Sequence, residues 1–370
     1  MKIGILTSSR ADYGIYLPLL NSLKDDPFFN LEIIAFGTHL SKSHGYTIND
    51  IEVDGYKIIH KISSLISNDD EQSISTTYAL TCLKFCDFWN YNKYDIVLCL
   101  GDRFEMSAAV QAAIPYGVKF AHIHGGETTL GAIDNIYRHQ ISLASTIHFT
   151  ATELFSSKVI ELIGDNNNVY NVGALSLDGI KKFQPIDKTF FFNKYNIPQK
   201  NYALVTFHPE TISGNLNESY ANEMVLALGK LTKSLFLIIT MPNADTMGSI
   251  FRNEIEKLKN NYPNAVLTIE NFGKENYFTA MYYAKVLIGN TSSGILEAAS
   301  FGKYVVNVGN RQKGRLQSKN VYNVTFQNES ITDIVNHVLN LGEFKGENLY
   351  YQKDSALTII EVLKKYYASI

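Results

Sequence analysis

The sequence predicts an α/β protein made of two Rossmann-like domains that face each other across a cleft. Short apolar runs alternate with helical stretches along the chain, which is the pattern of a parallel sheet covered by helices on both faces. The alternation starts afresh after residues 171–176, which indicates a second sheet. A chain of 370 residues with 45% hydrophobic content is long enough to form two cores.

Each apolar run is interpreted as a buried strand of one of the two sheets. The expected strands of the first domain are Ile3–Leu6, Leu31–Phe36, Ile96–Leu100 and Val118–His122. Those of the second domain are Tyr202–Phe207, Leu235–Thr240, Val266–Ile269, Val286–Ile288 and Tyr304–Val308. The last segment, Ser355–Tyr367, has the pattern of an amphipathic helix.

The domain boundary is expected near residue 180. Residues 175–200 are polar and contain Pro185 and Pro198, which is typical of a linker followed by a short helix. We therefore expect a first domain over residues 1–178 and a second domain over residues 179–354.

Composition excludes several classes of protein. The net charge is -3 and there is no long basic run, which argues against a nucleic-acid partner. The longest aliphatic stretch is far shorter than the ~18 residues of a membrane span, so no membrane partner is expected. Three cysteines, an odd number, favour free thiols in a reducing cytoplasm. The sequence contains neither a G-x-G-x-x-G after the first strand nor a G-x-x-x-x-G-K-[ST], which argues against dinucleotide oxidoreductases and P-loop enzymes.

Residues 286–297 (VLIGNTSSGILE) predict a phosphate site. A buried strand that ends at Gly289 is followed by a tight polar loop and by a helix expected from Ile295. Backbone N–H groups and hydroxyls of this loop would then lie at a positive helix end. Glu297, one turn into the helix, would reach a ribose hydroxyl. The alternative is an ordinary helix cap with spare serines.

Polar loops follow several of the expected strands, where open sheets of this kind bind ligands. They are Ser8–Gly14, Gly101–Glu105, His122–Glu127, Phe207–Thr211 and Met241–Asp245. Two facing sheets would enclose a small ligand between them. The first half supplies carboxylates and Arg10, and the second half supplies cations and hydrogen-bond donors. A diphosphate with a sugar on each side would satisfy both halves.

Asp102, Glu127 and Asp134 are the predicted acid–base residues. The first two follow neighbouring strands, and Asp134 begins a helix whose Arg138, one turn later, could orient it. Crowded carboxylates in a half-buried pocket have split pKa values, as acid–base catalysis requires. The alternatives are that Asp134 only caps its helix and that Arg103 and Arg138 only form salt bridges. A metal site of His122, His124 and Glu127 is less favoured, because no further ligand is evident.

Eight motifs resemble one enzyme family in consistent order. They are KIGILTSSRADYG at 2–14, GDR at 101–103, HIHGGE at 122–127, GAIDNIYRH at 131–139, HPET at 208–211, NADT at 243–246, NTSSG at 290–294 and GNRQKGR at 309–315. This set is similar to the hydrolysing UDP-N-acetylglucosamine 2-epimerases of bacterial sialic acid synthesis. SRADYG and GNRQKGR are typical of the hydrolysing branch. Asn135 stands where many relatives have a second acid, and Thr291 replaces the first serine of NSSSG.

The resemblance implies a fold like that of the GT-B glycosyltransferases, with the last helix (355–370) returning to the first domain. It also implies a homodimer, which the aromatic residues near Phe85–Tyr94 favour. The implied reaction converts UDP-N-acetylglucosamine and water to N-acetylmannosamine and UDP. The proton on carbon 2 is removed, UDP leaves by anti elimination, and the 2-acetamidoglucal is hydrated with inversion. We expect no cofactor and no metal.

The resemblance also assigns roles by motif position. The expected catalytic set is Asp102, Glu127, Asp134, Arg138 and His208. The expected substrate-binding set is Arg10, Arg103, Asn243, Thr291, Ser292, Ser293, Gly294, Glu297 and Arg311. Sister enzymes that act on UDP- or GDP-linked 2,4-diacetamido-2,4,6-trideoxyhexoses share these motifs. A GT-B glycosyltransferase and a nucleotide-sugar-binding regulator without turnover are the remaining alternatives.

Overall fold

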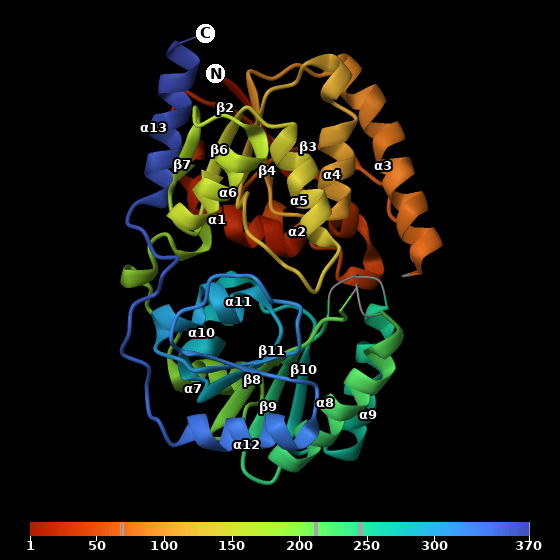
Figure 1. Cartoon of the computed structure of the whole chain (residues 1–370), viewed down its shortest axis with the longest axis vertical. Coiled ribbons are helices and arrows are strands. Elements are labelled where there is room, and N and C mark those ends of the chain that lie inside the picture. The colour runs from red at the N-terminus through yellow and green to blue at the C-terminus, as the bar shows by residue number, and fades with distance from the viewer. Residues whose placement is uncertain (67, 69, 211–213, 243–246, 370) are drawn as a thin grey trace. The chain divides into compact units, whose positions relative to one another are not determined.

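The computed structural model describes residues 1–66, 68, 70–210, 214–242 and 247–369. The chain forms two compact units, each with one parallel sheet and helices packed on it (Figure 1). The first unit contains Met1–Glu127, Asp134–Ile180 and Tyr350–Ile370. The second contains Thr128–Ile133 and Lys181–Leu349. The predicted α/β class with two parallel sheets is therefore confirmed.

The first unit contains a seven-stranded parallel sheet of order β3-β2-β1-β4-β5-β6-β7. Its strands are β1 (Lys2–Thr7), β2 (Asn30–Phe36), β3 (Ile58–Ile62), β4 (Ile96–Leu100), β5 (Phe120–Ile123), β6 (Ile147–Thr150) and β7 (Val169–Asn171). The sequence did not predict β3, β6 or β7. The two edge strands, β3 and β7, lack the continuous burial of β4, and β6 is only four residues long with a histidine inside it.

Helices cover both faces of this sheet because successive strand residues point to opposite sides. The helices are α1 (Arg10–Lys24), α2 (Ile48–Val53), α3 (Glu71–Tyr91), α4 (Phe104–Gln111), α5 (Asp134–Leu143), α6 (Glu153–Ile163) and α13 (Ser355–Ala368). Ile5 packs in one core with Leu19 of α1 and Leu363 of α13. Leu6 packs in the other core with Trp89 of α3.

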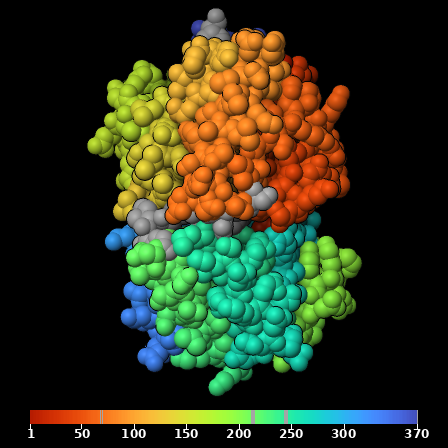
Figure 2. Space-filling view, turned by 90° about the vertical axis from the view of Figure 1, so that its right-hand side faces the viewer, coloured from red at the N-terminus to blue at the C-terminus, as the bar shows by residue number. Residues whose placement is uncertain are grey.

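Three aromatic side chains of α3 are core residues, whereas Tyr91 at the end of the helix is 81% exposed. Phe85 and Trp89 are 0% exposed and Phe88 is 8% exposed. They pack under the surface that this segment, orange in Figure 2, presents to solvent. These three rings stabilise the unit itself and give no support to a dimer surface, whereas the ring of Tyr91 is exposed. The homodimer stays a prediction that rests on the family resemblance.

The second unit contains a six-stranded parallel sheet of order β10-β9-β8-β11-β12-β13. Its strands are β8 (Tyr202–Thr206), β9 (Phe236–Thr240), β10 (Val266–Ile269), β11 (Val286–Gly289), β12 (Val305–Val308) and β13 (Val321–Val324). Its helices are α7 (Lys188–Lys194), α8 (Asn217–Leu231), α9 (Gly248–Asn261), α10 (Lys274–Tyr283), α11 (Ser292–Leu296) and α12 (Asn328–Leu339). Five of the strands match the predicted runs. The half-exposed edge strand β13 was not predicted.

The segment 128–133 packs within the second unit. The Leu130 N–H donates to the carbonyl oxygen of Lys313 at 2.9 Å. A Cβ atom at Gly131 would lie 2.3 Å from the carbonyl oxygen of Asn310, so this close approach requires glycine. No helix among the described residues is long and apolar enough to cross a membrane.

Candidate active site

Asp102 and Glu127 follow the neighbouring strands β4 and β5, and Arg138 of α5 connects them. The guanidinium of Arg138 forms an ion pair with Asp102, and its Nη1 lies 3.8 Å from Glu127 Oε2. Arg138 and Glu127 are each 1% exposed. A buried cation thus holds two carboxylates at the end of the first sheet. The guanidinium of Arg138 thus contacts two of the three predicted acids, and its role in orienting Asp134 stays a prediction.

His124 joins the same cluster. Its Nδ1 lies 2.6 Å from Glu127 Oε1, and its carbonyl oxygen accepts from Arg138 Nη1 at 2.8 Å. The residue is 5% exposed, and its backbone φ of 66° is uncommon for a residue other than glycine. Sequence reasoning considered His124 only as a metal ligand. The spacing of HIHGGE placed it on a strand, but did not reveal the turn that brings its ring to Glu127.

His122 has a supporting role one strand position earlier. Its Nε2 lies 2.8 Å from the carbonyl oxygen of Gly101, and its Nδ1 lies 3.0 Å from Ser142 Oγ. Burial lowers the pKa of His122 to about 3, so the ring is neutral and donates from Nε2. Both nitrogens therefore bind protein groups beside Asp102. Within the described ranges, no group of three or more His, Cys, Asp or Glu side chains is arranged to hold a metal ion.

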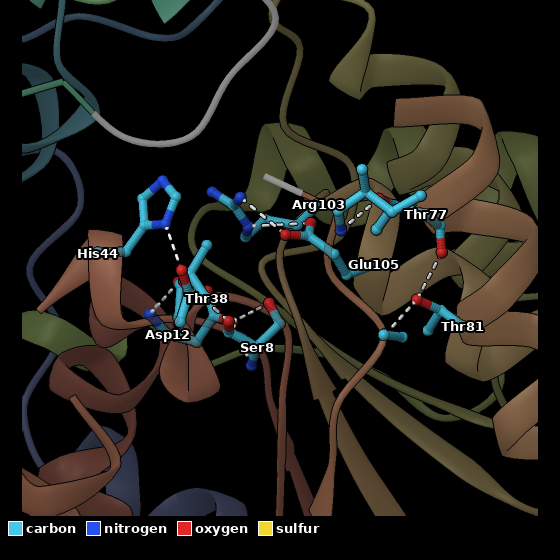
Figure 3. A network of polar contacts seen from close by, with 12 residues as sticks. Ser8, Asp12, Thr38, His44, Thr77, Thr81, Arg103 and Glu105 are labelled. Carbon is cyan, nitrogen blue, oxygen red and sulfur yellow. Dashed lines mark hydrogen bonds and ion pairs between the residues drawn. The ribbon is translucent and has the colours of Figure 1, made fainter. Parts of the chain in front are cut away.

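Arg103 lies in a second polar network of the first unit (Figure 3). Its guanidinium donates to both carboxylate oxygens of Glu105, at 3.0 and 3.2 Å. Burial raises the pKa of the Glu105 carboxyl, and the charge of Arg103 opposes that shift. Glu105 is 0% exposed, a feature that sequence reasoning missed. Arg103 therefore has a protein carboxylate as a partner, and its contact with substrate stays a prediction.

The loop that carries Arg10 is held from two sides. Arg10 is the first residue of α1, and the carboxylate of Asp12 accepts from the Ser8 N–H at 2.9 Å and from the Ser8 hydroxyl at 2.7 Å. The Thr38 N–H donates to the Ser8 carbonyl oxygen at 2.9 Å. Figure 3 shows Ser8, Asp12 and Thr38 grouped together. This bonding gives Arg10 a defined position at the carboxyl end of β1.

In the second unit, three loops follow the adjacent strands β8, β11 and β12, and Asn290 connects them. The side chain of Asn290 accepts from the His208 N–H at 2.7 Å and donates to the His208 carbonyl oxygen at 2.8 Å. Its own carbonyl oxygen accepts from Gln312 Nε2 at 2.8 Å and from Arg311 Nη1 at 3.4 Å. Sequence reasoning missed the structural role of this fully buried asparagine.

The loop from Thr291 to Gly294 differs in detail from the prediction. Helix α11 begins at Ser292, three residues before the expected start, and Glu297 is the residue that ends it. Glu297 is therefore not one turn inside a longer helix. Thr291 is the N-cap residue, but its side chain makes no capping hydrogen bond. An ordinary side-chain cap, the alternative from the sequence, is thus not formed by Thr291.

Tyr277 of α10 contacts this loop. Its hydroxyl lies 2.5 Å from Ser293 Oγ, and burial raises the pKa of Tyr277 to about 12. The phenol is therefore neutral at physiological pH. No motif in the sequence pointed to Tyr277, because it lies 16 residues before Ser293 on a separate helix.

Asp134 is the first residue of α5. Asn243 lies outside the described residues.

Comparison with known proteins decides the family. The family model described as UDP-N-acetylglucosamine 2-epimerase matches residues 21–364. The chain belongs to this family. The resemblance seen in the motifs is thereby confirmed for most of this epimerase-family chain.

Individual relatives agree with that assignment. The chain is 31% identical to the polysialic acid biosynthesis protein P7 of Escherichia coli, over 100% of this chain and 95% of the relative. It is 33% identical to a GDP/UDP-N,N'-diacetylbacillosamine 2-epimerase (hydrolyzing) of Campylobacter jejuni, over 86% and 83% of the two chains. The crystal structure of UDP-GlcNAc 2-epimerase from Neisseria meningitidis bound to UDP-GlcNAc has the same fold, with a TM-score of 0.81, 18% identity and coverage of 99% and 100%.

Proposed function

We propose that this epimerase-family protein is a hydrolysing 2-epimerase that converts UDP-N-acetylglucosamine and water to N-acetylmannosamine and UDP. The observation that carries the proposal is the buried cluster in which Arg138 contacts both Asp102 and Glu127. A glycosyltransferase needs a donor site but has less use for clustered acids at the end of the first sheet. Epimerisation at carbon 2 requires groups that accept and donate protons.

The proposed reaction has two steps. In the first, the C2–H bond breaks, its electron pair forms the C1–C2 double bond, and UDP leaves with the electrons of the C1–O bond. In the second, water adds a proton to carbon 2 and a hydroxyl to carbon 1. We assign proton transfer to the Asp102, Glu127 and Asp134 region. We assign diphosphate binding to Arg10, His208 and the hydroxyls of Ser292 and Ser293.

Cationic and hydroxyl donors suit the diphosphate because its charge grows as it leaves. Hydrogen bonds to an ionised phosphate are about twice as strong as neutral ones. The loops after β8, β11 and β12 end at one edge of the second sheet, and Asn290 bonds to two of them. This supports assigning the nucleotide to these loops. Glu297, buried beside them, is assigned to the ribose, and Asn243 and Arg311 to the nucleotide.

A second candidate substrate is a UDP- or GDP-linked 2,4-diacetamido-2,4,6-trideoxyhexose. The relative from Campylobacter jejuni is named for such a sugar at 33% identity, and the Escherichia coli relative is named for polysialic acid biosynthesis at 31%. The two substrates differ at carbons 4 and 6 and undergo the same reaction at carbons 1 and 2.

One incubation tests the proposal. The protein is mixed with UDP-N-acetylglucosamine alone, and in parallel with the UDP- and GDP-linked diacetamido sugars, and products are followed by NMR. We expect UDP and free N-acetylmannosamine with no acceptor present. Release of UDP or GDP only from a diacetamido sugar would select the second candidate. A UDP-linked epimer without UDP release, transfer only to an added acceptor, or binding without turnover would each contradict a hydrolysing epimerase.

A further inference from the structure

We infer that Nε2 of His124 is the atom that takes the proton from carbon 2 and that Glu127 orients His124 without touching the sugar. This inference rests on the proposed function, because it names the proton acceptor of the elimination step. It replaces the sequence-based view in which Glu127 acts directly.

The first support is the hydrogen bonding of the imidazole. Nδ1 of His124 lies 2.6 Å from Glu127 Oε1, and the guanidinium of Arg138 lies 3.8 Å from the other oxygen, Oε2. A carboxylate at this position accepts from Nδ1–H, so the lone pair is on Nε2. A histidine whose one nitrogen is oriented by a carboxylate and whose other nitrogen carries a lone pair is the arrangement of a general base.

The second support is that Nε2 of His124 is buried without a hydrogen bond. This buried nitrogen has no hydrogen-bond partner among the residues that the structure describes. Buried polar atoms are nearly always bonded, so an unbonded one indicates a role such as catalysis. The two Glu127 oxygens, by contrast, already face His124 and Arg138. Nε2 is therefore better suited than Glu127 to contact a substrate atom.

The third support is the backbone conformation of His124. The φ of 66° at His124 is strained for a side chain of this size, and such strain clusters at active sites. The surroundings impose it: the His124 carbonyl oxygen accepts from Arg138, and its N–H donates to the Phe149 carbonyl oxygen at 2.9 Å. A Cβ atom at Gly126 would lie 2.3 Å from the carbonyl oxygen of Phe155, so the turn after His124 needs glycine. The turn therefore holds the ring against Glu127.

The proton transfer then has defined participants. The C2–H proton moves to Nε2 as UDP leaves, and the resulting imidazolium is stabilised by the carboxylate of Glu127. The charged groups of this cluster are Glu127, Arg138 and, through Arg138, Asp102, with neutral His122 close by. Hydration with inversion delivers a proton to the opposite side of carbon 2, so it uses a different group.

His124→Asn tests this inference. Asparagine tolerates a positive φ, so the turn is kept while the base is removed. Three quantities are measured: UDP affinity by calorimetry, UDP release from the nucleotide sugar, and hydration of 2-acetamidoglucal in the presence of UDP. We expect UDP release to fall ~10²–10⁴-fold, with UDP affinity and glycal hydration kept. His148→Asn is the control, since His148 is a buried histidine of β6 outside the cluster, and all three quantities should be kept.

The possible failures can be told apart. UDP release by His124→Asn at the wild-type rate would overturn the inference. Equal loss of UDP release and glycal hydration would also overturn it, because that pattern indicates a structural role. If the wild-type protein releases neither UDP nor GDP from any of the nucleotide sugars, the proposed function itself fails before the variants are compared.

Discussion

The hydroxyl of Tyr277 and Oγ of Ser293 lie 2.5 Å apart, which links helix α10 to the first turn of α11. Tyr277 thereby selects one orientation of a serine that we assign to the diphosphate. The contact joins two separate helices of the second unit, so it also limits movement of the 291–294 loop. Ser293 is half-buried, and its orientation is set by protein contacts rather than by solvent.

Tyr277→Phe is expected to weaken UDP binding. The variant keeps the ring and removes the hydroxyl, and a neutral hydrogen bond contributes about 0.5–1.5 kcal/mol, or roughly 2- to 10-fold in Kd. Calorimetry with UDP measures the effect. The matched control is Tyr283→Phe on the same helix, whose hydroxyl donates to the Ile186 carbonyl oxygen at 2.9 Å. Equal affinities of the two variants would show that Tyr277 does not position Ser293.

Glu127→Gln is expected to keep UDP binding and lose turnover by at least ~10²-fold. The amide preserves the shape but removes the charge that stabilises protonated His124. Because Glu127 and His124 act as one unit, the double variant with His124→Asn should be no slower than His124→Asn alone. Steady-state kinetics measures both. Glu32→Gln, which alters a half-buried carboxylate of β2, is the control. Near-wild-type turnover of Glu127→Gln would remove Glu127 from the mechanism.

Arg10→Ala and His208→Ala are each expected to weaken binding of UDP itself. A charge-assisted hydrogen bond to phosphate contributes about 1.5–3 kcal/mol, which is roughly 10- to 150-fold in Kd. His208→Ala keeps both hydrogen bonds with the Asn290 side chain, because these bonds involve only the backbone N–H and the carbonyl oxygen of His208. Lys24→Ala, at the far end of the helix that Arg10 begins, is the control. Unchanged UDP affinity in both variants would place the diphosphate elsewhere.

Acid is expected to destabilise the protein between pH 7 and pH 5. Burial lowers the pKa of His122 to about 3 and the pKa values of His39 and His148 to about 4. In the unfolded chain these groups titrate near 6.5. Below that pH the unfolded state binds protons that the folded state excludes, so stability falls with pH until the folded pKa values are reached.

The expected loss is about 2 kcal/mol per histidine at pH 5. Urea denaturation at several pH values measures it. His148→Asn should reduce the loss in the free energy of unfolding by the amount expected for one histidine. Substitution of the exposed His337 should leave that loss unchanged. A free energy of unfolding that is independent of pH over this range would contradict the assignment of three neutral buried histidines.

The predicted strands were confirmed where burial is continuous. Ile96–Leu100 is buried at every position, so the continuous apolar run in the sequence is enough to predict this strand. β3 alternates between half-buried and exposed positions and contains His60 and Lys61, so no apolar run marks it. The edge strand forms because the preceding strand, β2, offers it hydrogen bonds, a partner that the sequence of β3 does not reveal.

The kinds of residue that follow the strands can be identified from the sequence alone. Asp102, Glu127 and His208 each follow an apolar run, and parallel strands bring such positions to one edge of a sheet. The family and the fold class also follow from the motifs and the pattern.

Which of these groups contact one another depends on the packing of the folded chain. Arg138 of α5 pairs with Asp102, which is 36 residues away in the sequence. His124 meets Glu127 through a turn with a positive φ, and Tyr277 meets Ser293 across two helices. The physical reason is that side-chain contacts depend on how helices pack on the sheet and on which rotamers that packing allows. Residue spacing along the chain does not contain this information.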